Sequence, residues 1–419
     1  MKRFLLSDSN VARQVSKLIG DADDNAIEQS FARATFSLIS EPGDRFAGSL
    51  IQHLSAEGVL ELLINKSSEQ KFRALLTEND SLEEFESKFG DFSSAFSDAI
   101  QRWMPRLKLN EVMAALEAAI ACEAKLLTPA NMSWPGQLSD LGDSTPHCLW
   151  GRGKDIESAL ANPAIAIVGS RISTSYGEWV TSEIVTDSSS RGLAIVSGGA
   201  YGIDAMAHRS ALANDQVTIA FMAGGIDRLY PSGNASIFEK LVHRGALLAE
   251  QAPGASPTKW RFLQRNRLIA ALGQATVVVE AGQRSGALNT VTHALQIDRP
   301  VGAVPGAITS QSSAGCNRLI AEGLVTTICH PGQAADLALG KAGWFQQELA
   351  GLGAFETRAL DALEYKSISE GQVASKAGLT QREVSIALGQ LSLLGLVKQT
   401  DKGWLKLPLE SEQRSEAGD

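Results

Sequence analysis

The sequence predicts an α/β protein built on a doubly wound, Rossmann-like parallel sheet, with a helical N-terminal domain and a C-terminal winged-helix-like domain. Between residues 165 and 327, short apolar runs alternate with segments of helical periodicity. Such alternation is typical of parallel strands joined by crossover helices. Residues before this region show only helical periodicity, and residues after it give three helical segments and two short strands. These three observations predict the fold class.

The first 128 residues predict the helical domain, because apolar residues recur there at three- and four-residue spacing. No motif in this part indicates a chemical role. Residues 129–335 form the predicted core, which opens with an extended connector at 129–163. Within it, Gly151-Arg152-Gly153-Lys154 is not a nucleotide-binding P-loop, since Cys148 stands where the motif needs its first glycine.

In the core, apolar runs predict strands and the gaps between them predict helices. The predicted strands are 165–168, 193–197, 217–221, 246–248, 276–280 and 301–304, and the predicted helices are about 178–191, 203–213, 234–244, 263–272, 285–296 and 315–322. A parallel sheet with helices on both faces holds its site in the loops at the carboxyl ends of the strands.

After the core we expect a linker at 336–353, the winged-helix-like domain at 354–408 and a disordered tail at 409–419. The third helix of that domain, about 381–394, carries Arg382 beside Glu383 and no other cation. A helix that reads duplex DNA is ordinarily more basic. We therefore favour a protein-contact or regulatory role for this domain over DNA binding.

Composition sets the broad class. The 419 residues are 44% hydrophobic and 20% charged, and four cysteines lie far apart with no CxxC pair. These features are typical of a globular protein in a reducing compartment without a disulfide framework or zinc site. The apolar stretch at 4–6 is too short for a signal peptide, and no run could span a bilayer. We expect a cytoplasmic protein with no membrane association, metal or cofactor.

The net charge of −9 is unevenly distributed. Residues 165–322 hold thirteen Lys/Arg and eleven Asp/Glu, so the negative charge lies elsewhere. The stretch from Lys259 to Arg267 has four cations and no carboxylate. Because local charge decides electrostatic binding, the overall acidity does not exclude a nucleic-acid partner.

Two loops of the predicted sheet resemble anion cradles. Gly169-Ser170-Arg171 lies between a strand and a helix, where backbone N–H groups, the positive helix end and a bidentate arginine suit a phosphate. Ser197-Gly198-Gly199 opens a second glycine-rich turn, whose spacing is not the dinucleotide GxGxxG. A plain turn remains the alternative for the first loop. For Asp204 and His208, which share a helix face, we favour structural hydrogen bonds over a metal or acid–base pair.

Two further loops complete the candidate edge. The basic stretch interleaves its cations with Trp260 and Phe262, and single-stranded nucleic acid binds to such combinations of charge and stacking rings. The alternative is a solvated helix start with Phe262 in the core. The fourth loop holds Ser285-Gly286 at a helix start, with Arg284 as a further donor, although a plain turn fits equally well. The candidate DNA-binding residues are Gly169, Ser170, Arg171, Ser197, Gly198, Gly199, Lys259, Phe262, Arg265, Asn266, Arg267, Ser285 and Gly286.

These motifs, in this order, resemble the DNA-processing protein A (DprA, or Smf) family. The matching residues are Gly169-Ser170-Arg171, Ser197 to Asp204, Ala207-His208, Gly225 to Asn234 with Tyr230-Pro231, Phe262, Arg265-Asn266-Arg267, Val279-Glu280-Ala281, Ser285-Gly286 and Val304-Pro305-Gly306. The resemblance covers roughly residues 130 to 330.

The resemblance implies a cytoplasmic single-stranded-DNA-binding protein with no catalytic step and no catalytic residues. It also implies a homodimer that protects incoming DNA and helps load the RecA recombinase during natural transformation. In such a protein Arg171, Lys259 and Phe262 hold the strand, assisted by backbone groups near Ser197 to Gly199 and Ser285-Gly286.

A nucleotide-binding enzyme on a similar sheet is the rival interpretation. The lysine-decarboxylase-like nucleotide N-glycosidases need a Pro-Gly-Gly-x-Gly-Thr run. This chain has only Gly224-Gly225 and Val304-Pro305-Gly306, and neither continues that way. A dinucleotide-dependent oxidoreductase would need the missing GxGxxG turn.

Overall fold

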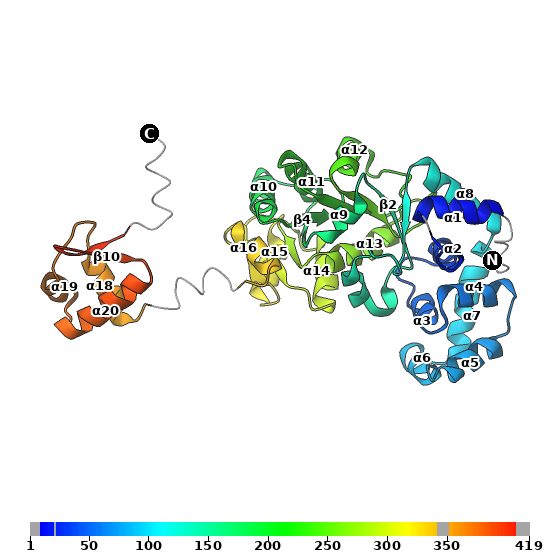
Figure 1. Cartoon of the computed structure of the whole chain (residues 1–419), viewed down its shortest axis with the longest axis horizontal. Helices are drawn as coiled ribbons and strands as arrows, with labels where there is room; N and C mark the ends of the chain where they lie inside the picture. The colour runs from blue at the N-terminus through cyan, green and yellow to red at the C-terminus, as the bar shows by residue number, and fades with distance from the viewer. Residues whose placement is uncertain (1–8, 21, 342–351, 408–419) are drawn as a thin grey trace. The chain divides into compact units, whose positions relative to one another are not determined.

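The computed structural model describes residues 9–20, 22–341 and 352–407. Contacts divide the chain into two compact units, Met1–Lys341 and Ala342–Asp419 (Figure 1). The first unit contains the N-terminal helices and the sheet, and the second contains the C-terminal helices and a small hairpin.

The first part of unit 1 is helical, as predicted. Its helices are α1 (Ser9–Ile19), α2 (Asp24–Ile39), α3 (Arg45–Leu54), α4 (Ala56–Ile64), α5 (Glu69–Glu78), α6 (Leu82–Phe89), α7 (Phe92–Trp103), the 3-10 turn η1 (Met104–Arg106) and α8 (Leu109–Ala121). Helices α2, α3 and α7 begin after Asp23, Asp44 and Asp91, whose side chains accept hydrogen bonds from backbone N–H groups three residues on. Such caps satisfy donors that the first helical turn leaves unpaired.

The sheet has the strand order β1-β2-β6-β5-β4-β3-β7-β8-β9. Its strands are β1 (Lys125–Leu127), β2 (Leu149–Arg152), β3 (Ala164–Val168), β4 (Ala194–Ser197), β5 (Thr218–Met222), β6 (Ala246–Ala249), β7 (Ala275–Val278), β8 (Val301–Ala303) and β9 (Thr326–Thr327). From β6 to β9 all neighbours are parallel, which confirms the doubly wound sheet. The predicted extended connector supplies an extra strand, β2, which pairs antiparallel with both β1 and β6.

Helices cover both faces of the sheet (Figure 1). They are η2 (Gly136–Ser144), α9 (Ile156–Ala161), α10 (Ser175–Ser190), α11 (Ile203–Ala213), η3 (Ser232–Asn234), α12 (Ala235–Arg244), α13 (Lys259–Leu272), α14 (Ala287–Gln296), α15 (Ala314–Ala321) and α16 (Gly332–Ala338). Alternate residues of a strand serve opposite faces. Ile219 and Phe221 of β5 pack with α13 and α14, whereas Ala220 and Met222 pack with α12 and the N-terminal helices. One core therefore joins the helical region to the sheet.

Unit 2 consists of α18 (Ala354–Ala362), α19 (Glu370–Ala377), α20 (Gln381–Leu393), β10 (Val397–Thr400) and β11 (Gly403–Lys406). The two strands pair antiparallel, and Thr380 caps α20. This element order agrees with the predicted one, while the winged-helix assignment stays a prediction. The predicted linker begins inside α16, and residues 342–351 and 408–419, which include the predicted tail at 409–419, lie outside the described residues.

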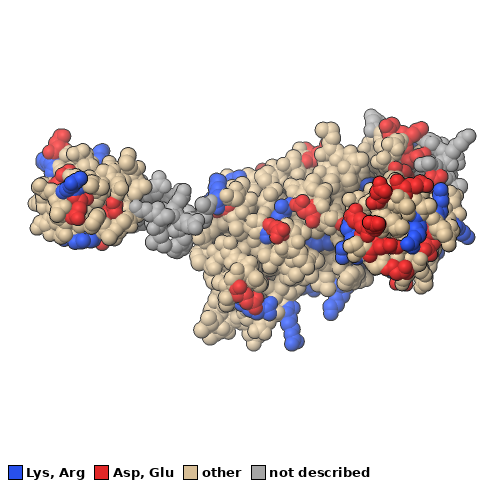
Figure 2. All heavy atoms as spheres, turned by 90° about the horizontal axis from the view of Figure 1, so that it is seen from below, with Lys and Arg blue, Asp and Glu red and all other residues tan. Residues whose placement is uncertain are grey.

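In the described part of the chain, no helix combines the length and apolar character needed to cross a membrane. Figure 2 shows one face of the molecule, on which acidic side chains gather at the end of unit 1 where the N-terminal helices lie. The first 128 residues hold twenty Asp/Glu and fourteen Lys/Arg. The excess negative charge therefore lies partly on the helical region.

Candidate nucleic-acid interface

The candidate site lies where the chain reverses direction in the sheet. From β3 the strands proceed through β4, β5 and β6 on one side, and β7 then pairs with β3 on the other side. In open α/β sheets, ligands bind at such a switch point, beyond the carboxyl ends of the strands. Here the loop Gly169-Ser170-Arg171 follows β3, and the loop that contains Glu280 and Ser285 follows β7.

Glu280 takes up donors of the loop that holds the first predicted cradle. The backbone N–H of Ser170 donates to the carbonyl oxygen of Glu280 at 2.7 Å. The Glu280 carboxylate accepts from the backbone N–H of Thr174 at 2.9 Å and from its hydroxyl at 2.6 Å. A side chain at Gly177 would overlap this carboxylate. Two backbone donors of the loop before α10 are therefore used within the fold, while the side chain of Arg171 is exposed.

The second predicted cradle is occupied in the same way. Asp204 accepts hydrogen bonds from the backbone N–H groups of Gly198 and Ala200, at 3.2 and 3.4 Å. Burial raises the pKa of Asp204, and the charge of Arg265 acts in the opposite direction. Ser197 is buried, and its hydroxyl donates to the carbonyl of Ile167 at 2.7 Å. This loop is therefore shaped by internal hydrogen bonds.

His208 does not join Asp204 in a reactive pair. Its Nδ1 lies 2.7 Å from the hydroxyl of Thr218, and the ring is fully buried. Burial, assisted by the charge of Arg265, lowers the pKa of His208 to about 3. The structural role favoured for this histidine agrees with that geometry.

The second half of the basic stretch lies in helix α13, and its side chains bond to several of the loops. Arg265 donates to the carbonyl oxygens of Gly198, at 2.7 Å, and of Phe221. Asn266 donates to the carbonyl of Gly286 at 3.4 Å. Both side chains are buried, and burial lowers the pKa of Arg265 to about 10, so the guanidinium stays charged at neutral pH. These residues connect strand β5 with the loops that follow β4 and β7.

Arg267 forms a buried ion pair rather than a surface contact. Its guanidinium nitrogens lie 2.6 and 2.8 Å from the two carboxylate oxygens of Glu250, which follows β6. Two further hydrogen bonds go to the carbonyl of Ser144, at 2.9 and 3.1 Å. The Arg267 side chain is 3% exposed. The side chains of Arg265, Asn266 and Arg267 are buried and bond to protein groups. The structure therefore does not expose these three predicted DNA-binding residues at the surface.

The first turn of α13 is different, because it lies at the surface. Phe262 is half-buried, and its ring centroid lies 5.4 Å from the guanidinium carbon of Arg171 and 5.6 Å from the ring centroid of Tyr230. We call Arg171, Tyr230 and Phe262 the ring cluster. Trp260 is 54% exposed and Lys259 is exposed beside it. Three segments far apart in sequence thus meet at a surface of rings and cations.

Arg171 and Lys259 have no ion-pair partner among the residues that the structure describes. An exposed guanidinium near an aromatic face adds a cation–π attraction of about 0.5–1 kcal/mol. It still leaves its N–H groups available to an anion. The ring cluster and Lys259 therefore offer both charge and stacking surface.

The last predicted loop lies beside α13. The side chain of Asn266 contacts its Gly286 carbonyl, and the Ser285 hydroxyl accepts from the backbone N–H of Ala287 at 3.3 Å. Gly286 and Arg284 are exposed. This loop contributes surface donors next to α13.

Some contributors were not predicted from the sequence as site residues. Tyr230 belongs to the Gly225 to Asn234 block, so the family pattern could have signalled it. Glu280 and Asp204 also stand in the quoted motifs, but no local pattern shows that their carboxyl groups turn into the loops. Glu41, which contacts Arg261 of α13, lies far upstream in a region without a recognisable motif.

The strand order defines a protein of the doubly wound α/β class. Its candidate binding surface lies at the switch point of the sheet. Residues 125–337 match the family model of DNA recombination-mediator protein A. The chain is 36% identical over 339 residues to the putative DNA processing protein DprA of Mycobacterium tuberculosis, which covers 75% of this chain and 85% of that relative. It is 33% identical over 232 residues to DNA processing protein DprA of Bacillus subtilis, covering 55% and 75%.

The solved structure of DNA processing protein A from Streptococcus pneumoniae matches with a TM-score of 0.55 at 26% identity, covering 73% of this chain and 96% of that one. The chain therefore belongs to the DNA recombination-mediator protein A family. The predicted family and fold class are confirmed, and membership supports a role in DNA processing.

Proposed function

We propose that this protein binds single-stranded DNA along the carboxyl edge of its sheet. Arg171 and Lys259 hold phosphates, and Phe262, with Trp260 beside it, stacks on bases. The observation that carries this proposal is the meeting of an accessible ring with two exposed cations that have no ion-pair partner within the described parts of the chain. Charge that follows the backbone and rings that stack are the two elements of single-strand binding.

The proposal changes the roles of several predicted residues. Gly169 and Ser170 shape the loop that presents Arg171, and Ser197, Gly198 and Gly199 shape the neighbouring loop. From inside the fold, Arg265 holds the Ser197 to Gly199 loop, Asn266 holds the loop at Gly286, and Arg267 holds Glu250. The exposed backbone at Gly286, beside half-buried Ser285, assists the strand directly.

Filled cradles also argue against the rival nucleotide enzyme. Enzymes that bind a nucleotide phosphate use free N–H groups at a helix start. In the loop that leads into α10, the N–H groups of Ser170 and Thr174 already bond to Glu280. We therefore propose a binding protein without a catalytic step.

The finer biological role comes from the family resemblance. We propose a cytoplasmic homodimer that protects incoming single strands and helps load the RecA recombinase in natural transformation. Sedimentation of the free chain tests the dimer. The rate at which recombinase filaments assemble on a protected strand, with and without this protein, tests the loading role.

The site is tested by fluorescence anisotropy of a labelled single strand of about 20 nucleotides across a salt series. Wild type should prefer the single strand to its duplex, since stacked pairs hide the base faces. Arg171→Ala and Lys259→Ala should each weaken binding several-fold and make the log–log salt slope shallower by about 0.7. Phe262→Leu should weaken binding with an unchanged slope.

Lys154→Ala is the matched control, because it removes an exposed lysine beside the start of β6, at the opposite edge of the sheet. If Arg171→Ala and Lys259→Ala behave like Lys154→Ala, the carboxyl edge is not the binding surface. Turnover of a nucleoside monophosphate would favour the enzyme instead.

A further inference from the structure

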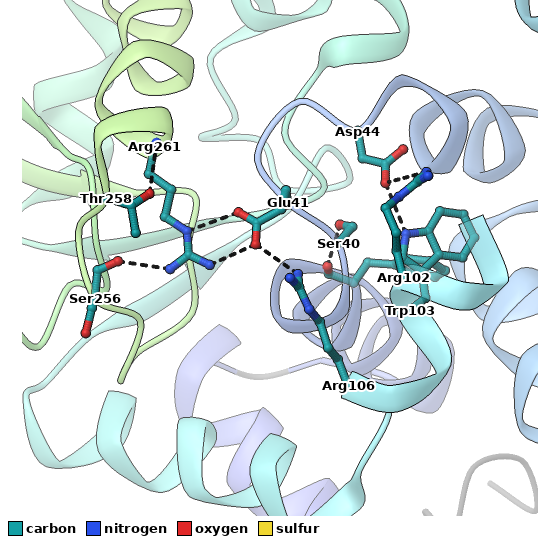
Figure 3. A network of polar contacts seen from close by, with 10 residues as sticks. Ser40, Glu41, Asp44, Arg102, Trp103, Arg106, Ser256, Thr258 and Arg261 are labelled. Carbon is teal, nitrogen blue, oxygen red and sulfur yellow. Dashed lines mark hydrogen bonds and ion pairs between the residues drawn. The ribbon is translucent and has the colours of Figure 1, made fainter. Parts of the chain in front are cut away.

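The first turn of α13 is attached to the N-terminal helical region by one arginine. Arg261 stands between Trp260 and Phe262, but its guanidinium lies against Glu41, in the connection between α2 and α3 (Figure 3). Its Nε and Nη2 donate to the two carboxylate oxygens of Glu41, each at 3.1 Å. A third donor, Nη1, bonds to the carbonyl of Ser256 at 2.9 Å. The Arg261 side chain is 17% exposed, so this contact is largely shielded from solvent.

Glu41 is itself held firmly. Arg106 of η1 donates to it at 2.9 Å. Nearby, Asp44 accepts from the indole N–H of Trp103 at 3.0 Å and lies 3.7 Å from Arg102 (Figure 3). Burial by itself would raise the pKa of Glu41, but the hydrogen bonds and charges of Arg261 and Arg106 outweigh it and lower that pKa. The carboxylate is therefore ionised at neutral pH and fixed from both sides.

The rest of α13 explains why this attachment matters. From Arg265 to Leu272 every residue is buried, so the body of the helix cannot move without disrupting the core. The first turn, from Lys259 to Phe262, projects beyond that body and is half-buried or exposed. First turns lack part of their hydrogen bonding and fray easily. Local contacts hold this one through the Thr258 cap, the Arg261 bond to Ser256 and the ring of Phe262, and the Arg261–Glu41 pair adds an ion pair to the N-terminal helical region.

We propose that Glu41 is a positioning residue for single-stranded DNA: it holds Arg261, and through it fixes the first turn of α13 so that Lys259, Trp260 and Phe262 face the strand. The inference rests on the proposed function and assigns a role in it to the helical N-terminal region. Glu41 does not touch the DNA.

The sign of the expected effect separates this role from simple electrostatics. Glu41→Gln removes a negative charge close to a polyanion's binding surface. Electrostatics alone would then make DNA bind more tightly. A positioning role instead requires weaker DNA binding, because the neutral amide holds Arg261 less well and the first turn of α13 loosens.

The experiment measures binding of the same 20-mer by the full chain. Glu41→Gln should bind roughly three- to tenfold more weakly, as expected for losing a partly shielded ion pair that orders the site. Glu111→Gln is the control, since it removes a carboxylate paired with Lys108 in the same helical region. It should bind as tightly as wild type or slightly more tightly.

Two further readouts distinguish positioning from general damage. Amide hydrogen exchange should accelerate at residues 259–262 in Glu41→Gln, with the melting temperature nearly unchanged. Arg261→Met should reproduce the loss of affinity, and the double variant should bind no more weakly than either single variant, because both break the same link. Arg261→Lys, which keeps the charge but not the paired geometry, should restore only part of the affinity.

The outcomes are separable. If wild type binds no DNA, the proposed function is wrong and this inference fails with it. If wild type binds but Glu41→Gln binds equally well, or the two single losses add in the double variant, only the positioning role is overturned. Tighter binding with a steeper salt slope would also overturn it, since Glu41 would then be masking Arg261 from the DNA.

Discussion

His147 and His208 are buried histidines whose rings stay uncharged. Burial lowers both pKa values to about 3, assisted by the charges of Arg33 and Arg267 at His147 and of Arg265 at His208. In the unfolded chain each would titrate near its ordinary value of about 6.5. The unfolded state therefore binds more protons than the folded state below that pH.

A pH dependence of stability follows from these two residues. Their contribution is fully present above about pH 6.5 and is lost progressively as the pH falls toward 3, by at most about 1.4 kcal/mol per pH unit for each histidine. Chemical denaturation at about pH 7 and about pH 5.5 should show a lower free energy of unfolding at the acidic value. His208→Gln, whose amide can still bond to Thr218, should reduce that difference. An unchanged difference would show that His208 is protonated in the folded protein.

The sequence predicts which residue types lie at the site better than it predicts which way their side chains point. The cations and rings of the basic stretch correctly mark α13 as part of the sheet edge. They do not show that Arg265 and Arg267 point inward, because a helix buried on all sides has no polar face to reveal its orientation. Nor could the loop sequences show that Glu280 and Asp204 fill the cradles, since each depends on how a carboxyl group turns within the folded loops.

Among the elements, α13 has the largest share in assembling the site. It contacts loops that follow several strands, and its Arg267–Glu250 pair links it to the end of β6. Removing one member of a buried ion pair leaves the other charge without compensation, which is far more costly than the pair's own contribution. The integrity of the site should therefore depend on this internal pair.

Arg267→Met should lower the free energy of unfolding by roughly 3–5 kcal/mol. The double variant Arg267→Met/Glu250→Leu should recover much of that loss, because no unpaired charge then remains. Denaturant titration of the three proteins checks this. A double variant as unstable as Arg267→Met alone would mean that the hydrogen bonds to Ser144, rather than the ion pair, hold this end of the helix.

Most elements of the core could be predicted because fully buried strands appear as continuous apolar runs, which the helical patterns between them set apart. The predicted helix at 203–213 has the bounds of α11, and the predicted strand 301–304 differs from β8 by one residue. Strand β2 was missed, since it lies in a segment rich in proline and glycine. Its pairing with β6 is a tertiary contact with no local signal.

For the molecule as a whole, the separation of the core of unit 2 from those of unit 1 decides what can fold alone. One core contains residues of the N-terminal helices together with Trp150 and the strands β5 and β6. A different core belongs to unit 2 and contains Trp404 with residues of α18, α19 and α20. The composition changes near residue 128, but the first core crosses that point, and the predicted domain boundary there stays a prediction.

Residues 1–341 should therefore fold without unit 2 and bind the single strand as tightly as the full chain. Residues 129–341 should fold poorly, because removing the helices exposes the apolar face that they cover. Thermal unfolding and anisotropy of both fragments check this expectation. Weaker binding by residues 1–341 would assign part of the DNA contact to unit 2.

The shared core also has a consequence for the order in which the protein is synthesised. Helix α8 ends at Ala121, whereas β6, which completes this core, ends at Ala249. At ordinary translation rates the helices wait on the order of ten seconds for these strands. During that interval their apolar face has no partner within the chain. Chaperone binding and aggregation during expression should therefore occur mainly in this interval. Variants that weaken β5 or β6 should lower the yield of folded protein before they alter the binding site of the mature protein.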